Sequence, residues 1–245
     1  MPELELFHKH YWSPLAAYGL TNDFWQITRE TVINTWCVLA VICILIVTLR
    51  IALRNKNSVV SYSAISFVRA FQDLIEQSLG YFNFNHFCFV TSLFTFIVLC
   101  NLISLIPFLA EPTSDLSTTL ALGICSFIYV QGNSIKFNGI LGYLKEFMEP
   151  FFFMLPLHLV GLLATIISIS FRLFGNIFGG VIISELYLSG IGGKPLWEIV
   201  GIVSGLNIII TIFFVIFEGV IQAFVFSMLS LTYLSLAISH KENHA

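Results

Sequence analysis

Residues 151–189 read FFFMLPLHLVGLLATIISISFRLFGNIFGGVIISELYLS, an apolar run with a single arginine and a single glutamate. A helix of this length would extend about 58 Å at about 1.5 Å per residue, nearly twice the ~30 Å hydrocarbon core of a bilayer. It either lies inclined by roughly 60° to the membrane normal or breaks at the glycines of residues 175–180. Because the apolar segment 196–239 is also overlong, we expect a steeply inclined helical hairpin over 151–239.

The composition of the whole chain is that of a membrane protein. Only 11 of its 245 residues are Lys or Arg and 14 are Asp or Glu, whereas 57% are hydrophobic and the mean hydropathy is +0.90. A soluble domain carries about 25% charged residues, so the sequence excludes this class. The net charge of −3 gives no reason to expect nucleic-acid binding. We predict an all-α polytopic membrane protein, with residues 1–245 forming one integral-membrane domain.

The positions of the charged residues predict the topology of the first helix. Residues 32–53 are long enough to span a bilayer, and Arg50, Arg54 and Lys56 lie at their end. The positive-inside rule places this end in the cytoplasm and the N-terminal segment 1–31 outside. Since no basic segment precedes the helix, we expect it to be retained rather than cleaved as a signal peptide.

Two further segments complete the expected architecture. Residues 60–82 place Arg69, Asp73 and Glu76 among apolar residues at helical spacing, which predicts an amphipathic helix on the cytoplasmic surface. Residues 87–133 form a membrane hairpin that crosses outward and returns. Together with the first helix and the inclined hairpin, this gives about five membrane helices.

Motifs for independent catalysis and for cofactor binding are absent from the sequence. The five cysteines lie in apolar runs without CxxC spacing, as embedded free thiols do, and no metal site is predicted. The chain has no GxxxxGK[ST] phosphate loop, GxGxxG motif or serine elbow. We therefore expect no nucleotide, no cofactor and no enzymatic activity of the chain by itself.

Polar residues recur at helical spacing along the first arm of the hairpin. An arginine at the centre of a membrane helix costs about 2.5–3.5 kcal/mol on insertion scales, so such a residue marks an ion or proton path by default. The alternative is an arginine that snorkels to a lipid headgroup or pairs with a buried acid. The polar stripe consists of His158, Thr165, Ser168, Arg172 and Asn176.

A second polar stripe follows the last segment of the chain. Interhelical hydrogen bonds can account for Ser204, Thr165 and Thr211, but less easily for the charges of Arg172, Glu185 and Glu218. The stripe consists of Ser204, Asn207, Thr211, Glu218, Gln222 and Tyr233. Two such stripes on antiparallel helices can face each other.

Three strings in the chain resemble a known family. They are FRLFGN (171–176) followed by IFGG, IQAFVFSMLSLTYLSLA (221–237), and NLISLIPF with PTSDLSTTLALG (within 101–123). They are similar to subunit a of the membrane sector of rotary (F-type) ATP synthase, and the resemblance covers about residues 30–240.

The resemblance implies a stator subunit that holds an inclined helical hairpin against a rotating c-ring. Two half-channels would couple transmembrane proton flow to rotation of the ring. The implied partners are the c-ring, the peripheral stalk subunit b and the lipid bilayer. The implied location is a bacterial plasma membrane, with an organellar inner membrane as the alternative, and the C-terminus would be cytoplasmic.

Three residues match motif positions of the family. Arg172 matches its essential arginine, Asn176 the asparagine one turn later, and Gln222 the glutamine of the last helix. An arginine side chain stays protonated, so it can pair with a ring carboxylate but cannot relay a proton. Arg172 is therefore expected to act as an electrostatic latch and as a block to proton leakage.

The level pairing of Arg172 with Gln222 that the family implies would place Glu218 near Asn176, and Asn207 near Glu185. Glu185, Asn207 and Glu218 then lie on the outer side of the arginine, where we expect them to line the inlet half-channel. Asp115, in the outer PTSD loop, would lie near its mouth. His158 would belong to the outlet path or, alternatively, anchor the start of its helix at the membrane interface.

The chain departs from the family pattern at Val181 and Val215, where family members often carry ionisable residues. Glu185 and Glu218 are each displaced by about one helical turn and can substitute on the same face. The individual roles of the two glutamates stay open, as does whether the coupling ion is H⁺ or Na⁺. An autonomous ion channel or secondary transporter, or a membrane scaffold without transport, is the alternative function.

Overall fold

The computed structural model describes residues 11–12, 27–54, 59–106, 109, 111–148, 153, 155–191, 205, 209–210 and 212–239. This part of the chain is helical, apart from the antiparallel pair of two-residue strands β1 (Tyr11–Trp12) and β2 (Ile27–Thr28). Its α-helices are α1 (Arg29–Arg54), α2 (Val59–Leu79), α3 (Phe84–Leu102), α4 (Leu116–Met148), α5 (Leu155–Ile191) and α8 (Gly219–Ser239). Two 3₁₀ turns, η4 (Ile103–Leu105) and η5 (Pro112–Ser114), and a π-helix, η7 (Ile212–Glu218), complete these elements.

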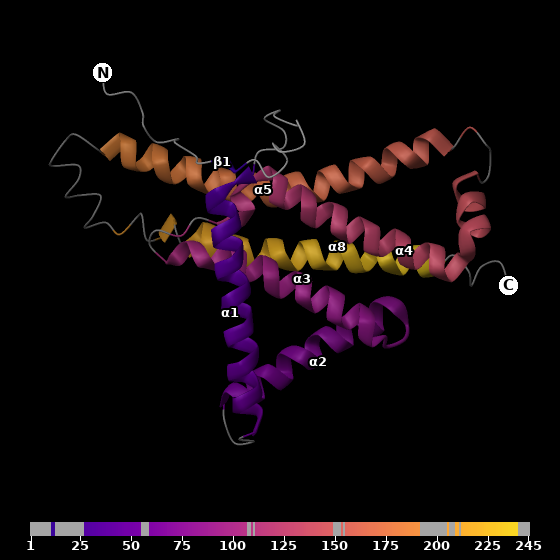
Figure 1. Ribbon diagram of the computed structural model, residues 1–245, viewed down its shortest axis with the longest axis horizontal. Helices are drawn as coiled ribbons and strands as arrows, with labels where there is room; N and C mark the ends of the chain where they lie inside the picture. The colour runs from indigo at the N-terminus through magenta and orange to yellow at the C-terminus, as the bar shows by residue number, and fades with distance from the viewer. Residues whose placement is uncertain are drawn as a thin grey trace.

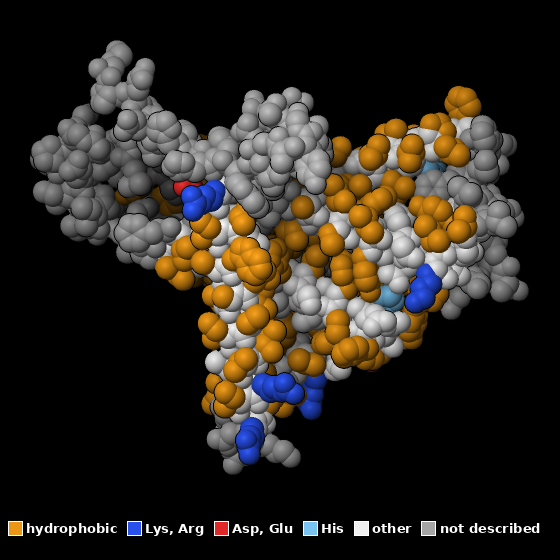
Figure 2. All heavy atoms as spheres, in the orientation of Figure 1, with side chains coloured by type: hydrophobic (Ala, Val, Ile, Leu, Met, Phe, Trp, Pro, Cys, Tyr) orange, Lys and Arg blue, Asp and Glu red, His pale blue; other side chains and the backbone are white. Residues whose placement is uncertain are grey.

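Four helical segments of the described chain are long and apolar enough to cross a membrane. They are Arg29–Arg54, Phe84–Leu105, Leu155–Ile183 and Ile212–Ile238. Much of their apolar surface is uncovered, as at Trp36, which is 69% exposed on α1. Figure 2 shows hydrophobic side chains along α1 and Lys or Arg side chains at its lower end. The chain is thus a multi-pass membrane protein, as the composition predicts.

Helix α4 differs from the prediction of a membrane helix at 116–133. It continues to Met148, with non-helical backbone angles at Gly139 (φ 73°, ψ 161°), where the chain kinks. Polar side chains such as Gln131 and Asn133 lower its hydropathy, and α4 is not among the four apolar spans. The fifth membrane helix therefore remains a prediction.

Local sequence signals explain how α2 ends and α3 begins. Gly80 adopts a left-handed conformation (φ 76°) and its amide donates to the Glu76 carbonyl at 2.9 Å, so the glycine ends α2. Asn83 caps α3, since its side-chain oxygen accepts from the Asn85 amide at 3.0 Å. The observed bounds of α2 are therefore close to the predicted residues 60–82, and α3 begins just before residue 87, the predicted start of the membrane hairpin.

The predicted amphipathic pattern of α2 appears as a buried face that packs on the rest of the chain. Phe71 and Ile75 are buried against residues of α3 and α8, whereas Arg69, Asp73 and Glu76 are exposed. Figure 1 shows α1, α2 and α3 arranged as the sides of a triangle. A helix with one buried face and one charged face suits a boundary between protein and water.

The hairpin arms supply the largest buried cluster. Its buried residues come from three helices, α3, α5 and α8, and α4 packs against both arms of the hairpin. In Figure 1, α4, α5 and α8 run crosswise to α1. The buried members are Leu93, Ile97, Ile169, Leu173, Ile177, Ala223 and Phe226.

Helix α5 passes through its glycines without a break. Its 37 residues form one element from Leu155 to Ile191, about 56 Å long at about 1.5 Å per residue. Of the two interpretations left open by the sequence, the structure favours an unbroken helix over one that breaks at residues 175–180. The second arm is described as residues 209–210, η7 and α8, and the predicted turn between the arms lies outside the described residues.

Helices α4 and α5 are in close contact at Gly123. A side chain added there would collide with the Ser170 hydroxyl, and the Ile166 carbonyl lies only 3.4 Å from the same position. Ser170 is fully buried, so its hydroxyl has little room to move. A glycine at this position is therefore a requirement of the packing.

We expect Gly123→Ala to loosen the α4–α5 contact and to lower stability by about 1–3 kcal/mol, the usual range for overpacking. Gly132→Ala is the matched control, because a side chain on that glycine of α4 meets nothing within 4 Å. Thermal unfolding of the purified protein in detergent measures both. Equal melting temperatures for the two variants would contradict this account, and Ser170→Ala should rescue Gly123→Ala.

Candidate functional site

A hydrogen-bonded pair of side chains joins the two arms of the hairpin. With its amide nitrogen facing the carboxylate, Asn176 of α5 donates to both oxygens of Glu218, at 2.8 and 3.0 Å. Glu218 is the last residue of η7, directly before α8. The predicted proximity of Asn176 and Glu218 is therefore observed, whereas their roles in ion transport stay predictions.

A second close approach gives the same alignment of the arms. A side chain on Gly180 would lie 3.1 Å from the Phe214 ring, so Gly180 of α5 faces Phe214 of η7. Both pairs imply one antiparallel register, in which Arg172 lies level with Gln222. The level pairing implied by the family resemblance thus agrees with two contacts in the structure.

Arg172 is exposed on the surface of α5. Its neighbour Leu173 is fully buried and Phe171 is 50% exposed, so Arg172 lies on the outward side of the helix. No ion pair to Arg172 is found among the residues that the structure describes. A guanidinium on an apolar membrane helix requires an anionic or polar partner, and this chain supplies none within the described part.

Gln222 lies on the buried side of α8, four residues after Glu218. It is 8% exposed, and its amide nitrogen is buried without a hydrogen-bond partner among the described residues. Buried side-chain donors are usually satisfied. The unpartnered amide lies level with the exposed Arg172, so the hairpin has unmet hydrogen-bonding capacity at this height.

The π-helix at the site has a geometric consequence for Glu218. Its seven residues, Ile212–Glu218, precede the regular helix that begins at Gly219. π-helical segments are rare and occur often at functional sites. A change from π to α spacing re-aims the side chains before it relative to those after it, which explains why a simple helical count predicts this arm less well.

Asp115 lies at the junction of several elements. It accepts a hydrogen bond from the Thr31 hydroxyl at 3.2 Å, which ties the start of α1 to the loop. Its carbonyl accepts from the amides of Thr118 and Thr119 at the start of α4. The adjacent turn η5 contacts α1, α3, α4 and α5. The loop that contains Asp115 therefore lies beside α5.

Sequence reasoning missed two polar residues near this loop. Asn101 is 2% exposed, donates to the Gly219 carbonyl at 3.0 Å and accepts from the Thr113 hydroxyl at 3.2 Å. Burial raises the pKa of the Glu111 carboxyl, and a hydrogen bond with Ser104 opposes this shift only partly. Neither residue belongs to the two polar stripes, so the helical spacing gave no signal for them.

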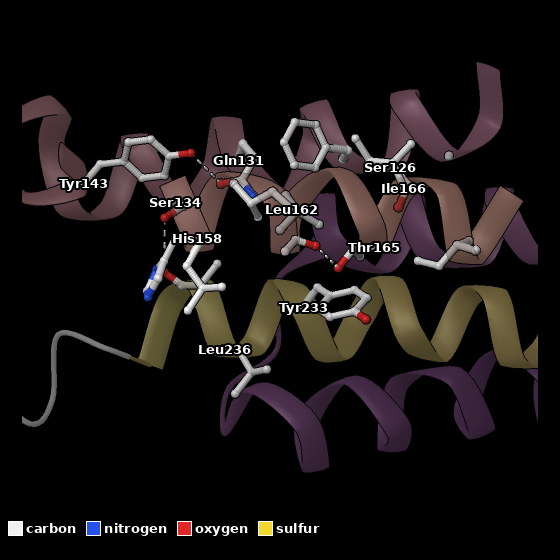
Figure 3. Close-up of a pocket in the computed structure, with 17 residues that line it drawn as sticks. Ser126, Gln131, Ser134, Tyr143, His158, Leu162, Thr165, Ile166, Tyr233 and Leu236 are labelled. Atoms are coloured by element: carbon white, nitrogen blue, oxygen red, sulfur yellow. Dashed lines mark hydrogen bonds between the residues drawn. The ribbon is translucent and has the colours of Figure 1, made fainter. Parts of the chain in front are cut away.

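A cavity of about 500 Å³ lies between α4, α5 and α8. Figure 3 shows His158 and Thr165 of α5, Tyr233 of α8, and Gln131 and Tyr143 of α4 around it. The Tyr143 hydroxyl donates to the Gln131 side-chain oxygen at 2.9 Å. The lining extends from His158 to Ile169, one turn before Arg172.

The structure divides the predicted polar stripe of α5. Thr165 lines the cavity and donates to the Gly161 carbonyl at 3.0 Å, whereas Ser168 and Arg172 are exposed. Asn176 turns to Glu218 instead. The residues of the stripe therefore have three different surroundings along the length of α5.

Some predicted site residues cannot be placed. Glu185 lies within α5, but its side chain is outside the described part, and Asn207 is outside it altogether. Among the described residues, no group of three His, Cys, Asp or Glu side chains could hold a metal ion. The five cysteines are free thiols, as predicted.

Four helices apolar enough to cross a membrane, and a hydrogen-bonded polar pair between two of these apolar segments, define a multi-pass membrane protein with a polar site between its helices. A profile of the family described as ATP synthase A chain matches residues 32–235. The chain belongs to this family.

Individual relatives agree with the family. ATP synthase subunit a 2 of Picosynechococcus sp. is 38% identical over 157 residues, which cover 64% of this chain and 62% of that protein. ATP synthase subunit a of Moorella thermoacetica is 31% identical over 237 residues, covering 95% and 94%. The sodium ion specific ATP synthase subunit a of Propionigenium modestum is 31% identical over 230 residues, covering 86% and 75%. The chain thus spans less than two thirds of the Picosynechococcus protein.

The register of the hairpin can be tested by cross-linking in a variant without native cysteines. We expect Asn176→Cys and Glu218→Cys to react efficiently with a short bifunctional thiol reagent, because their native side chains are in hydrogen-bond contact. Asn176→Cys with Phe214→Cys is the matched control, one turn out of register. Gel mobility of a fragment pair cleaved in the turn measures the yield. Preferential cross-linking of the control pair would contradict the register.

Proposed function

We propose that the chain is the ion-translocating stator subunit of an F-type ATP synthase, in which Arg172 faces a carboxylate of the rotating c-ring. The observation that carries the proposal is the exposed Arg172, level with Gln222 and one turn from the Asn176–Glu218 pair. The chain would be a membrane subunit rather than the catalytic one, and ATP chemistry would belong to its partners.

The chemistry of Arg172 suits a latch. A guanidinium stays charged, so it attracts an ionised ring carboxylate but cannot carry a proton past it. Its exposure on α5 leaves it accessible to a partner subunit. A self-contained channel would instead pair this charge within its own chain.

The inlet half-channel would lie on the Glu218 side of Arg172. Glu218 and Asn176 would form its inner end, and Glu185 and Asn207 would line it further out. Asp115 would lie near the mouth, because η5 packs beside α5. A proton delivered here neutralises a ring carboxylate, which can then leave Arg172 and rotate into lipid.

The cavity between α4, α5 and α8 would form the outlet half-channel. It begins one turn from Arg172, on the side opposite to Glu218, and reaches His158 at the first turn of α5. Side chains such as Tyr233 and Thr165 give it a partly polar wall. His158 would then lie where the path opens to the cytoplasm, and its alternative role as an interfacial anchor is compatible with this position.

The orientation in the membrane follows from the charges. The basic end of α1 would face the cytoplasm, with the N-terminus outside and the C-terminus inside. α5 would be steeply inclined, because about 56 Å of unbroken helix must fit a core of about 30 Å. A bacterial plasma membrane is the proposed location, with the c-ring and the peripheral stalk subunit b as partners. Each proton would gain about 2.3 kcal/mol per 100 mV of membrane potential.

The central test replaces Arg172. We expect Arg172→Ala to abolish ATP-driven proton pumping by the reconstituted complex, and Arg172→Lys to lose most of it, because an ammonium can deprotonate and lacks the planar fork. Arg69→Ala, an exposed cation on α2, is the control and should pump normally. Quenching of a pH-sensitive dye in vesicles measures pumping. Coupled pumping at normal rates by Arg172→Ala would refute the proposal.

A second test concerns the inlet. We expect Glu218→Gln and Glu185→Gln each to slow proton-driven ATP synthesis, by about tenfold for Glu218, since loss of one positioned proton-transfer group typically costs 10²-fold or more and water can replace part of it. The c-ring content of each purified complex controls for assembly. Full synthesis rates in both variants would remove the inlet assignment while leaving the latch intact.

A further inference from the structure

Asn101 occupies an unusual position for an amide. It lies in the last turn of α3, is 2% exposed, and both ends of its amide are hydrogen-bonded. Its nitrogen donates to the Gly219 carbonyl at 3.0 Å, and its oxygen accepts from the Thr113 hydroxyl at 3.2 Å. One side chain thus connects α3, η5 and the first residue of α8.

The contact with Gly219 depends on the absence of a side chain there. A Cβ on Gly219 would lie 3.1 Å from both the Cβ and the Nδ2 of Asn101. The amide therefore packs directly on bare backbone, at the point where η7 changes to α8. A π-to-α junction is a weak point in the helical hydrogen-bond ladder, so an outside donor stabilises it.

Glu218 is the residue immediately before this anchored backbone. Asn176 holds its carboxylate from α5, and Asn101 holds the backbone of its neighbour from α3. The two asparagines therefore hold Glu218 at its carboxylate and at the backbone of the residue that follows it. Neither amide carries a charge, so neither forms an ion pair with the carboxylate.

The second partner of the amide, Thr113, lies in the outer loop. Thr113 is fully buried and lies between Glu111 and Asp115, the two carboxyl groups of this loop. Among the described residues, the titratable groups next to this connection along the chain are these two, Glu218, and Cys100, which lies beside Asn101 on α3. One side chain therefore links the loop to the backbone next to Glu218.

We propose that Asn101 is a positioning residue for Glu218, which holds the carboxylate in line with the inlet and couples it to the outer loop at residues 111–115. This inference rests on the proposed inlet role of Glu218. It goes beyond that role because the position of the Glu218 carboxylate would depend on a residue of a third helix, α3. A buried amide that merely joins helices would stabilise the protein without affecting the response to outer pH.

The experiment uses the complete reconstituted complex at a fixed cytoplasmic pH and a fixed potential, with the pH of the outer compartment varied. We expect Asn101→Leu to lower the rate of ATP synthesis about tenfold and to shift the outer-pH midpoint, since small misplacements of a reacting group have effects of this size or larger. In the Glu218→Gln background, the same substitution should change the rate by less than about twofold, because coupled residues are not additive.

Thr113→Val provides a second, shape-conserving variant if Asn101→Leu fails to assemble. It removes the hydroxyl that binds the Asn101 oxygen, and we expect a smaller shift in the same direction. Thr95→Val is the matched control, because the Thr95 hydroxyl bonds the Thr91 carbonyl within α3 itself at 2.8 Å. This control should have the rate and the outer-pH profile of the unsubstituted complex.

The outcomes separate the two proposals. If Glu218→Gln slows synthesis but Asn101→Leu and Thr113→Val leave the outer-pH profile unchanged, the positioning role is overturned. An equal loss from Asn101→Leu with and without Glu218→Gln overturns it as well, since Asn101 would then act elsewhere. If Glu218→Gln itself has full activity, the inlet role of Glu218 fails, and the positioning role fails with it.

Discussion

The contact between Asn176 and Glu218 sets the geometry on which the site depends. Two long helices can slide along each other by whole turns with little change in apolar burial, so a stripe of Leu, Ile and Phe specifies their register weakly. A half-buried carboxylate between them needs a donor, and Asn176 supplies it from α5. This requirement selects one register, and the fit of Gly180 against Phe214 is consistent with it. The level positions of Arg172 and Gln222 follow from the same alignment.

Polar groups inside the hairpin region are mostly satisfied by donors or acceptors from another helix. Ser126 of α4 donates to Ser230 of α8 at 2.7 Å, and Asn101 of α3 donates to the start of α8. In an apolar medium a polar group without a hydrogen-bond partner is costly. The side chains therefore bond to groups on the helices packed against them. Within the described residues, the buried hydroxyls of Ser170 and Ser227 also lack a partner, but the unpartnered amide of Gln222 and the exposed Arg172 lie at one height of the hairpin. That coincidence supports the proposal that another subunit completes the site there.

The sequence predicted the elements of this fold better than their contacts. Segment lengths and charge positions were enough for α1, α2 and α3, because hydropathy and capping act locally. Antiparallel pairing placed Glu218 beside Asn176, because each lies four residues from the pair Arg172 and Gln222 that the family resemblance sets level. The π-helix and the kink at Gly139 could not be foreseen, since each depends on how distant segments pack. Asn101 was missed for the same reason: its partners are 118 and 12 residues away, and no periodic pattern connects them.

The one-turn offset between Arg172 and Glu218 has a physical rationale. If the arginine lay level with the glutamate, the two would form an ion pair within the chain, and attraction at low dielectric would hold both charges. A latch neutralised in this way could not attract a carboxylate from a rotating partner. Because Glu218 is held by the neutral Asn176, and Arg172 lies about 5.4 Å further along α5, each charge is left for its proposed task. A neutral donor also positions the carboxylate by hydrogen bonds alone, without the ion pair that a cation in its place would form.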